Sequence, residues 1–164
     1  MGIAEPTVST ASEETVVRSL YDRMMDGWNQ GGGAAFAAPF DEECDFIAFD
    51  DTRFRGREEI ARFHEPLFKT HLKGMCLVGR VTDVRFLAPH IALMHAEGDT
   101  IMRGKSQPAP ERRSIQTLVA VKRSGEWRLV AFQSMRVRPI GRNLAGSLLW
   151  LASDWLWKWC LPKD

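Results

Sequence analysis

The sequence predicts an α+β fold in which a strongly curved, mostly antiparallel sheet wraps around N-terminal helices, with an extra helix at the C-terminus. Two helical patterns come first, four long strand patterns follow from residue 75 to residue 138, and the last two strands meet at the tight Ser124-Gly125 turn. Strands of about 12 residues span roughly 40 Å at ~3.3 Å per residue, so such a sheet must twist and bend. Any part of its concave face that the helices leave unfilled is a cavity.

The composition is that of one soluble globular domain. The chain has 164 residues, of which 45% are hydrophobic and 26% charged, and its net charge of +1 with scattered basic residues gives no reason to expect nucleic-acid binding. Cys44, Cys76 and Cys160 are an odd number without metal-ligand spacing, so we expect reduced thiols and a cytoplasmic protein. Residues 1–11 are polar, lack the apolar core of a signal peptide, and are expected to be flexible.

The first helix is predicted to begin at Thr10, because Glu13 three positions later has the spacing of a capping box. The glycines at 31–33 end it, and a helical turn over 34–38 follows. The apolar residues of this helix recur at helical spacing and form one stripe: Val16, Val17, Leu20, Tyr21, Met24, Met25 and Trp28.

A short strand pair and a second helix come next. Residues 44–49 alternate like a strand, and Phe54 with Arg55 is predicted to form a brief return strand. Acidic residues after Gly56 suit the first turn of a helix that ends near residues 73–74. Because Pro66 has no backbone N–H, this helix is expected to kink or restart there.

The meander is predicted over residues 75–87, 91–103, 111–123 and 126–138. In its last strand, alternation places apolar side chains from Trp127 to Val137 on one face, interrupted only by Gln133. Apolar residues also occur on the opposite face of the last two strands. Since the outer face of a single-layer sheet would otherwise be wet, this pattern indicates a partner subunit, and we expect a homodimer.

The local sequences of these segments resemble those of the NTF2-like superfamily, and within it those of the SnoaL-like group and its SgcJ/EcaC-type proteins. The resemblance runs from about residue 12 to 138. It is carried by Trp28, the Phe54-Arg55-Gly56-Arg57-Glu58-Glu59-Ile60 helix entry, residues 64–68 and 84–89, and the hairpin from Thr117 to Gln133. It implies a cone of helices against a curved sheet. Superfamily members include isomerases, cyclases, dehydratases and noncatalytic binding modules, so the fold alone selects no reaction.

Five residues are candidates for a site in the cone. Gln133 on an apolar strand face must meet a hydrogen-bonding partner or a ligand, and Gln116 on the neighbouring strand can converge with it. His64 lies beside apolar helix positions and can transfer protons near neutral pH. Asp45 is a candidate base, because the resemblance implies an acidic residue in isomerases and cyclases; parity leaves its direction open. Trp28 is expected to form an apolar wall.

Other chemistry is weakly represented. The chain has no glycine-rich phosphate loop after a strand, and we expect no cofactor and no metal site. His95, Glu97 and Asp99 alternate along one strand face, a pattern that fits a metal or acid-base cluster and also a solvated face paired with Arg113 or Arg136.

Residues 141–164 extend beyond the resemblance. They hold four of the six tryptophans and are predicted to form a Trp- and Leu-rich helix, too short and interrupted to span a bilayer. This helix either packs on the domain or a dimer, or lies in a membrane interface. The function expected overall is binding of a small apolar or aromatic molecule, with cofactor-free acid-base chemistry of the isomerase, cyclase or dehydratase type. The alternative is a noncatalytic binding or dimerisation module.

Overall fold

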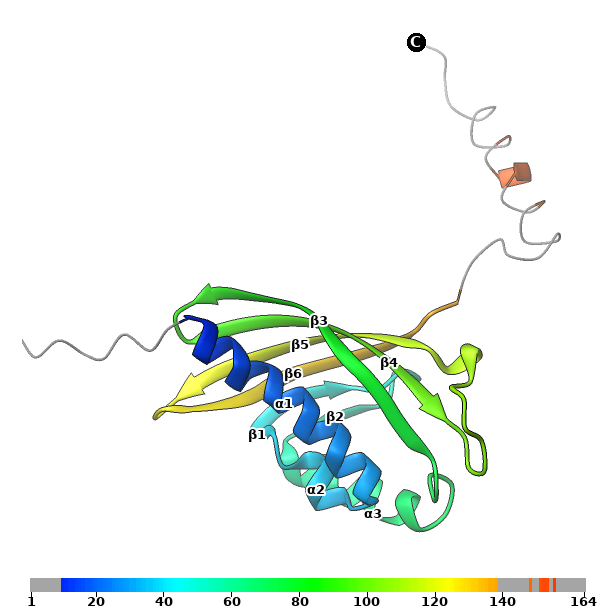
Figure 1. The fold of residues 1–164 in the computed structure, drawn as a ribbon, viewed down its shortest axis with the longest axis horizontal. Coiled ribbons are helices and arrows are strands. Elements are labelled where there is room, and N and C mark those ends of the chain that lie inside the picture. The colour runs from blue at the N-terminus through cyan, green and yellow to red at the C-terminus, as the bar shows by residue number, and fades with distance from the viewer. Residues whose placement is uncertain (1–9, 139–147, 149–150, 154, 156–164) are drawn as a thin grey trace, which may run out of the picture.

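The computed structural model describes residues 10–138, 148, 151–153 and 155 (Figure 1). Within 10–138, the helices are α1 (Thr10–Gln30), α2 (Gly33–Ala37), α3 (Arg57–Lys69) and a 3-10 turn, η1 (Pro110–Arg112). The strands are β1 (Phe40–Ile47), β2 (Arg53–Arg55), β3 (Cys76–Ala88), β4 (Ile91–Ile101), β5 (Ser114–Arg123) and β6 (Glu126–Arg136).

These strands form one sheet in the order β2-β1-β6-β5-β4-β3. Only the β1–β6 pair is parallel among the pairings of this sheet, because the chain crosses from the short β1–β2 hairpin through α3 into the long meander. The sheet is curved, α1 runs across it, and α2 and α3 lie together at one end (Figure 1). The predicted α+β fold class is therefore confirmed.

The core lies between α1 and the concave face of the sheet. The predicted apolar stripe of α1 is largely buried, with Val17, Leu20 and Tyr21 fully enclosed. They meet fully buried strand residues such as Met94 and Leu118. Burying a side chain of this size contributes about 1.5–3 kcal/mol, so this stripe is the main attachment of α1 to the sheet.

A pair of glycines opens a slot in the sheet for Tyr21. Gly79 on β3 faces Gly98 on β4 in the strand register. A Cβ atom on Gly79 would lie 2.4 Å from the Tyr21 hydroxyl oxygen, and one on Gly98 would lie 2.7 Å from Nε2 of Gln116. The Tyr21 hydroxyl therefore reaches the backbone of the sheet, where it lies 3.1 Å from Oε1 of Gln116 and 3.3 Å from the Glu97 carbonyl.

A β-bulge interrupts β6. Val119 of β5 pairs with Ala131, whereas the next residue, Ala120, pairs with Leu129, so Val130 is an extra residue in β6. Past this point the alternation of β6 reverses, which a bulge is expected to do. The prediction that Gln133 shares the buried face of Trp127 and Leu129 is consequently wrong, because Gln133 is exposed.

The helix start at Thr10 and the capping-box spacing lead to a different contact from the one expected. The Glu13 carboxylate accepts a hydrogen bond from the Trp127 indole N–H and pairs with the Lys122 ammonium at 2.7 Å. Glu13 thus links the first turn of α1 to the β5–β6 hairpin through a hydrogen bond and an ion pair. The hydrogen bonds from Lys122 and Trp127 hold the pKa of this carboxyl below its usual value.

The predicted second helix, α3, depends on a glycine before its first turn and contains a proline without a break. Gly56 precedes it with φ +84, and a Cβ there would lie 2.4 Å from the Glu42 carbonyl oxygen, so only glycine fits this turn. α3 runs without interruption through Pro66 to Lys69, so the expected restart at Pro66 does not occur. The predicted return strand is present as β2.

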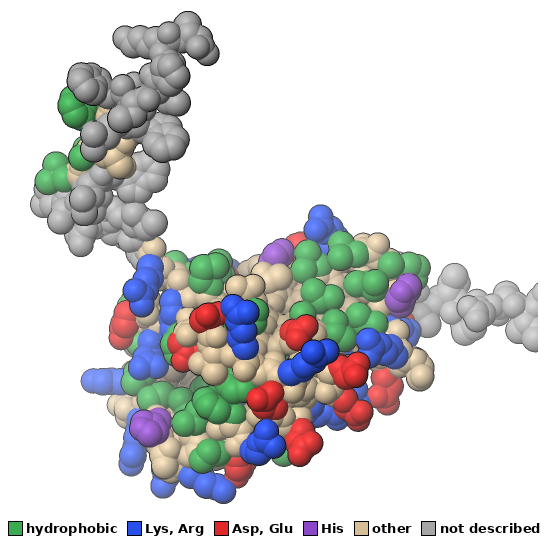
Figure 2. All heavy atoms as spheres, turned by 180° about the vertical axis from the view of Figure 1, so that it is seen from behind, with side chains coloured by type: hydrophobic (Ala, Val, Ile, Leu, Met, Phe, Trp, Pro, Cys, Tyr) green, Lys and Arg blue, Asp and Glu red, His purple; other side chains and the backbone are tan. Residues whose placement is uncertain are grey.

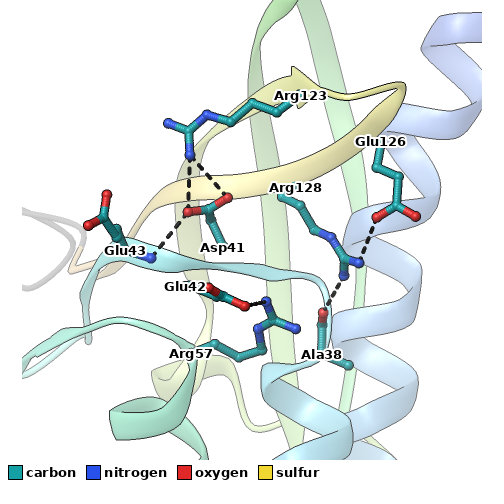
Figure 3. A network of polar contacts seen from close by, with 8 residues as sticks. All are labelled: Ala38, Asp41, Glu42, Glu43, Arg57, Arg123, Glu126 and Arg128. Carbon is teal, nitrogen blue, oxygen red and sulfur yellow. Dashed lines mark hydrogen bonds and ion pairs between the residues drawn. The ribbon is translucent and has the colours of Figure 1, made fainter.

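Charged side chains connect the start of β1 to the turn between β5 and β6 (Figure 3). Arg128 donates to the Ala38 carbonyl at 3.0 Å and pairs with Glu126 at 2.9 Å. Arg123 lies 3.3 Å from both carboxylate oxygens of Asp41. Exposed pairs of this kind contribute roughly 0–1 kcal/mol each, so they support the parallel β1–β6 contact without dominating it.

Most of the predicted C-terminal helix lies outside the described residues, and so do residues 1–9. Residues 148, 151–153 and 155 are helical, with Leu148, Leu151 and Trp155 exposed. In the part of the chain that the structure describes, no helix is both long and apolar enough to cross a bilayer. Whether this segment packs on protein or contacts a membrane stays a prediction.

Candidate functional site

A cavity of about 170 Å³ opens between the helices and the concave side of the sheet. Its lining is mostly apolar and aromatic, with polar groups from β4, β5 and β6 on one side. The residues around it are Met24, Met25, Trp28, Phe36, Phe46, Ala48, Phe49, His64, Leu72, Met75, Leu77, Gly98, Thr100, Arg112, Ser114, Gln116, Phe132, Ser134 and Arg136. An apolar cavity of about 150 Å³ is known to hold a benzene-sized molecule, so this one has room for a small ligand.

His64 lies at the inner wall of this cavity in an aromatic surrounding. Its side chain is 6% exposed, and its ring centroid lies 4.7 Å from that of Phe36 and 5.9 Å from that of Phe46. Phe46 in turn stacks on Phe132 at 4.6 Å with an interplanar angle of 18°. The imidazole is therefore enclosed by rings that offer it no hydrogen bond of their own.

The protonation of His64 follows from this surrounding. Burial lowers the pKa of the imidazole below its ordinary value, and the hydrogen bond to the Ile60 carbonyl opposes this only in part. Nδ1 lies 2.8 Å from that carbonyl oxygen, which can only accept, so the neutral ring carries its proton on Nδ1. Among the described residues Nε2 then has no hydrogen-bond donor, so its lone pair can accept a proton or a hydrogen bond.

Trp28 supplies a donor at the same wall. Its indole packs edge-to-face on Phe36 and Phe68, and its ring centroid lies 6.1 Å from that of His64. The Nε1 atom is buried and has no hydrogen-bond partner among the described residues. A buried N–H without a partner costs about 1–3 kcal/mol, and only an acceptor brought within hydrogen-bond distance of Nε1 would remove that cost. Trp28 is thus more than the apolar wall that its sequence position suggests.

Gln116 lines the cavity but is already part of a structural network. Its Oε1 accepts from the Tyr21 hydroxyl, and its Nε2 donates to Oγ of Ser114 at 2.8 Å. The Ser114 hydroxyl in turn donates a hydrogen bond to the Gly98 carbonyl at 3.1 Å. Since Nε2 carries two hydrogens, Gln116 keeps one donor for a ligand.

Two of the predicted site residues lie away from the cavity. Asp45 is exposed on the outer side of β1, opposite the buried Phe46, so its carboxylate does not reach the interior. Gln133 is exposed because the bulge at Val130 turns it outward. The structure therefore brings together Trp28, His64 and Gln116, and separates them from Asp45 and Gln133.

Sequence reasoning missed the cationic side of the cavity. Simple alternation places Arg136 on the outer face, and Arg112 lies in the turn η1 before β5. Both line the cavity together with Ser114 and Ser134. A predicted bulge in β6 would have placed Arg136 on the cavity side. The sequence around Val130 and Ala131 does not indicate a bulge.

The other polar groups of the described residues suggest no further reactive site. No group of three or more His, Cys, Asp or Glu side chains is arranged to hold a metal ion in that part of the chain. Glu97 instead pairs with Arg113 at 3.0 Å, as expected for a solvated strand face. Burial raises the pKa of the Cys44 thiol to about 11, so this cysteine is a poor nucleophile near neutral pH.

Comparison with known families identifies the class of protein. A family model described as a SnoaL-like domain matches residues 17–135. The chain therefore belongs to the SnoaL-like family and has an NTF2-like fold, as the sequence resemblance predicted. The narrower SgcJ/EcaC-type assignment stays a prediction. No curated protein matches the chain.

Solved structures show the same fold. A protein of unknown function with a cystatin-like fold from Nostoc punctiforme is 33% identical, with a TM-score of 0.76 over 92% of this chain and 98% of that chain. A putative calcium/calmodulin-dependent protein kinase type II association domain from Thiobacillus denitrificans is 14% identical, with a TM-score of 0.63 over 73% of this chain and 94% of that chain. A hexachlorocyclohexane dehydrochlorinase, LinA-type3, from Novosphingobium barchaimii is 9% identical, with a TM-score of 0.65 over 78% and 88% of the two chains. The last two share the fold alone.

The lowered pKa of His64 predicts a pH dependence of stability. As the pH drops below about 6.5, the unfolded chain gains a proton on this histidine while the folded chain does not, so the free energy of unfolding falls. The free energy of unfolding is therefore not reduced by His64 above that pH. It falls as the pH is lowered, until the pH reaches the lowered pKa of His64 in the folded state. Urea denaturation of the His64→Phe variant should show a shallower fall between pH 7 and pH 5 than the wild type. His71→Phe, at an exposed histidine, is the control, and equal slopes in all three proteins would contradict the neutral state of His64.

Proposed function

We propose that this protein binds a small apolar or aromatic molecule in the cavity and that His64 is its acid-base group. The observation that carries the proposal is the pairing, on one apolar wall, of a buried Trp28 N–H without a partner among the described residues and a neutral His64 with a free Nε2. A mostly apolar pocket with a few convergent polar groups is the usual form of a small-molecule site. SnoaL-like proteins share a fold with isomerases and dehydrochlorinases, which supports a ligand-binding or catalytic role.

The chemistry available at this wall needs no cofactor. A neutral imidazole that is protected from water can take a proton from a carbon next to a carbonyl group. Negative charge then develops on the carbonyl oxygen, where the Trp28 N–H or the free hydrogen of Gln116 can stabilise it. Isomerisation, aldol-type cyclisation and elimination of water can each begin with such a proton transfer. Of the two candidate proton-transfer residues, Asp45 and His64, we propose His64 as the base, because the Asp45 side chain is exposed.

Cavity filling tests the binding proposal. Phenol, indole and acetophenone are small enough to enter, and saturation-transfer NMR should detect each on the wild-type protein. Ala48→Phe fills the space beside Phe46 and should abolish the signal, because Ala48 lines the cavity. Ala11→Phe places the same ring at an exposed position of α1 and should leave the signal unchanged. Binding that survives Ala48→Phe, or no binding by the wild type, would rule out this cavity as the site.

Acetophenone also distinguishes a catalyst from a binding module. In deuterated water, its methyl hydrogens should exchange in the presence of the wild-type protein. His64→Phe should stop the exchange while the saturation-transfer signal persists, since phenylalanine fits the aromatic surroundings. Binding without any exchange by the wild type would assign the alternative function, a noncatalytic module.

We also propose a homodimer through the outer face of β4, β5 and β6. Apolar side chains gather on this side of the molecule with charged residues around them (Figure 2). Leu93 and Val119 are cross-strand partners there and are only half-buried, and Ile115 and Met135 are 46% and 55% exposed. Polar residues share this face, since Glu97 is the cross-strand partner of Ile115, so the apolar side chains form a patch within a mixed surface. A copy of the same face supplies a matching patch.

Charge on this face tests the dimer. Sedimentation velocity should show a dimer for the wild type and a monomer for Leu93→Glu/Val119→Glu, because two carboxylates in each copy would then be desolvated without partners. Gln30→Glu adds a carboxylate at an exposed position at the end of α1 and should leave the dimer intact. A wild type that sediments as a monomer at all concentrations would reject the proposal.

A further inference from the structure

The inner face of β6 changes character along the cavity. Beyond the bulge, Phe132, Ser134 and Arg136 lie in succession on the cavity side of the strand. At ~3.3 Å per residue, about 13 Å separate the first and the last of these residues along the strand. Phe132 stacks on Phe46, which borders His64, so Arg136 lies at the end of the cavity away from the histidine.

The neighbouring strand repeats this gradient. In the register of β5 and β6, Leu118 pairs with Phe132, Gln116 with Ser134, and Ser114 with Arg136. The sheet side of the cavity therefore passes from an apolar layer through an amide and hydroxyl layer to a cationic one. A purely apolar ligand would contact only the apolar layer. The amide and hydroxyl layer and the cationic layer therefore indicate a ligand that also has a polar end.

The guanidinium of Arg136 is held in place at this end. It donates a hydrogen bond to the Arg112 carbonyl and lies 4.0 Å from the centre of the Phe49 ring. Partial burial and the charge of Arg112 lower the pKa of Arg136, and the charges of Asp50 and Glu111 offset this in part. A cation so placed is positioned by neutral groups, and it has given up part of its hydration.

Arg112 and Arg136 differ from the other half-buried arginines in the described part of the chain. Arg18, Arg57 and Arg128 each form an ion pair, with Glu14 at 2.7 Å, Glu42 at 3.5 Å and Glu126 at 2.9 Å. Neither cavity arginine has a carboxylate within 4.0 Å among these residues, although Asp50 and Glu111 are near enough to influence the pKa of Arg136. Asp50 instead accepts a hydrogen bond from the Thr52 backbone. Two cavity-lining arginines, close enough for the charge of Arg112 to lower the pKa of Arg136 and without an ion pair among the described residues, favour an anion at this end of the cavity.

We propose that the ligand of this cavity is an organic anion, with an apolar or aromatic body against Phe46 and Phe132 and a carboxylate between Arg112 and Arg136. The inference rests on the proposed binding function and narrows its ligand class. Guanidinium groups bind carboxylates through paired, charge-assisted hydrogen bonds, which suits a planar acid at the rim of an apolar pocket. The body of such a ligand would bring its carbon chain toward Nε2 of His64 and the Trp28 N–H.

A matched pair of probes tests the charge. 3-Phenylpropionate and 3-phenylpropionamide have the same ring and chain and differ in the anionic end. Isothermal titration at pH 7 should give the acid an affinity at least about tenfold higher than the amide, the usual effect of a charge-assisted hydrogen bond. Arg112→Met and Arg136→Met should each reduce this preference, whereas Arg128→Met, at an arginine outside the cavity, should leave it unchanged.

A salt titration of the wild type gives the same information without a substitution. Sodium chloride should weaken binding of the acid and leave the amide unaffected. Equal affinity of acid and amide, or an acid preference that persists in both arginine variants, overturns the anion site while cavity binding stands. If neither probe binds and phenol and indole also fail, the proposed binding function is lost together with the anion site.

Discussion

The extra residue at Val130 in β6 is the constraint on which the interior of this protein depends. Before it, Trp127 and Leu129 point into the core beneath α1; after it, Phe132, Ser134 and Arg136 line the cavity. Without the bulge the strand would present Gln133 and Met135 to the cavity. A bulge also increases local twist, which helps a strand of this length follow a bowed sheet. One inserted residue thus sets which side chains of β6 line the site, and it contributes to the curvature together with the register shifts in the β1–β6 and β3–β4 pairs.

The two ends of the cavity differ in charge: the end near the helices is neutral and aromatic, and the other end is cationic. Near the helices, aromatic rings exclude water and keep His64 neutral, so that its lone pair is available for proton transfer. At the far end of the sheet, Arg112 and Arg136 lie near hydroxyl groups, with no carboxylate paired to them among the described residues. A ligand with an apolar body and a polar end satisfies both sides at once. Families with this fold vary in chemistry, and the proposed ligand specificity of this chain depends on these few side chains.

Much of the fold could be predicted from the sequence because its signals are local. The stripe of α1 and the Ser124-Gly125 turn each report their own element, and the described strands lie close to the predicted ranges. The site was predicted only in part. His64 and Trp28 lie on helices whose spacing fixes their direction, and they line the cavity. Gln133 failed because alternation assumes an uninterrupted strand, and Asp45 because parity alone does not say which face of a strand is buried.

A crystal structure determined under xenon pressure tests the central claim, a hollow lined by the inner face of β6, most directly. Xenon enters dry apolar cavities large enough to hold it. We expect a xenon atom in contact with Phe46 and Phe132, with Ser134 facing the same space and Gln133 outside. An interior filled by side chains without xenon, or a β6 strand that turns Gln133 into the hollow and Ser134 outward, would contradict it.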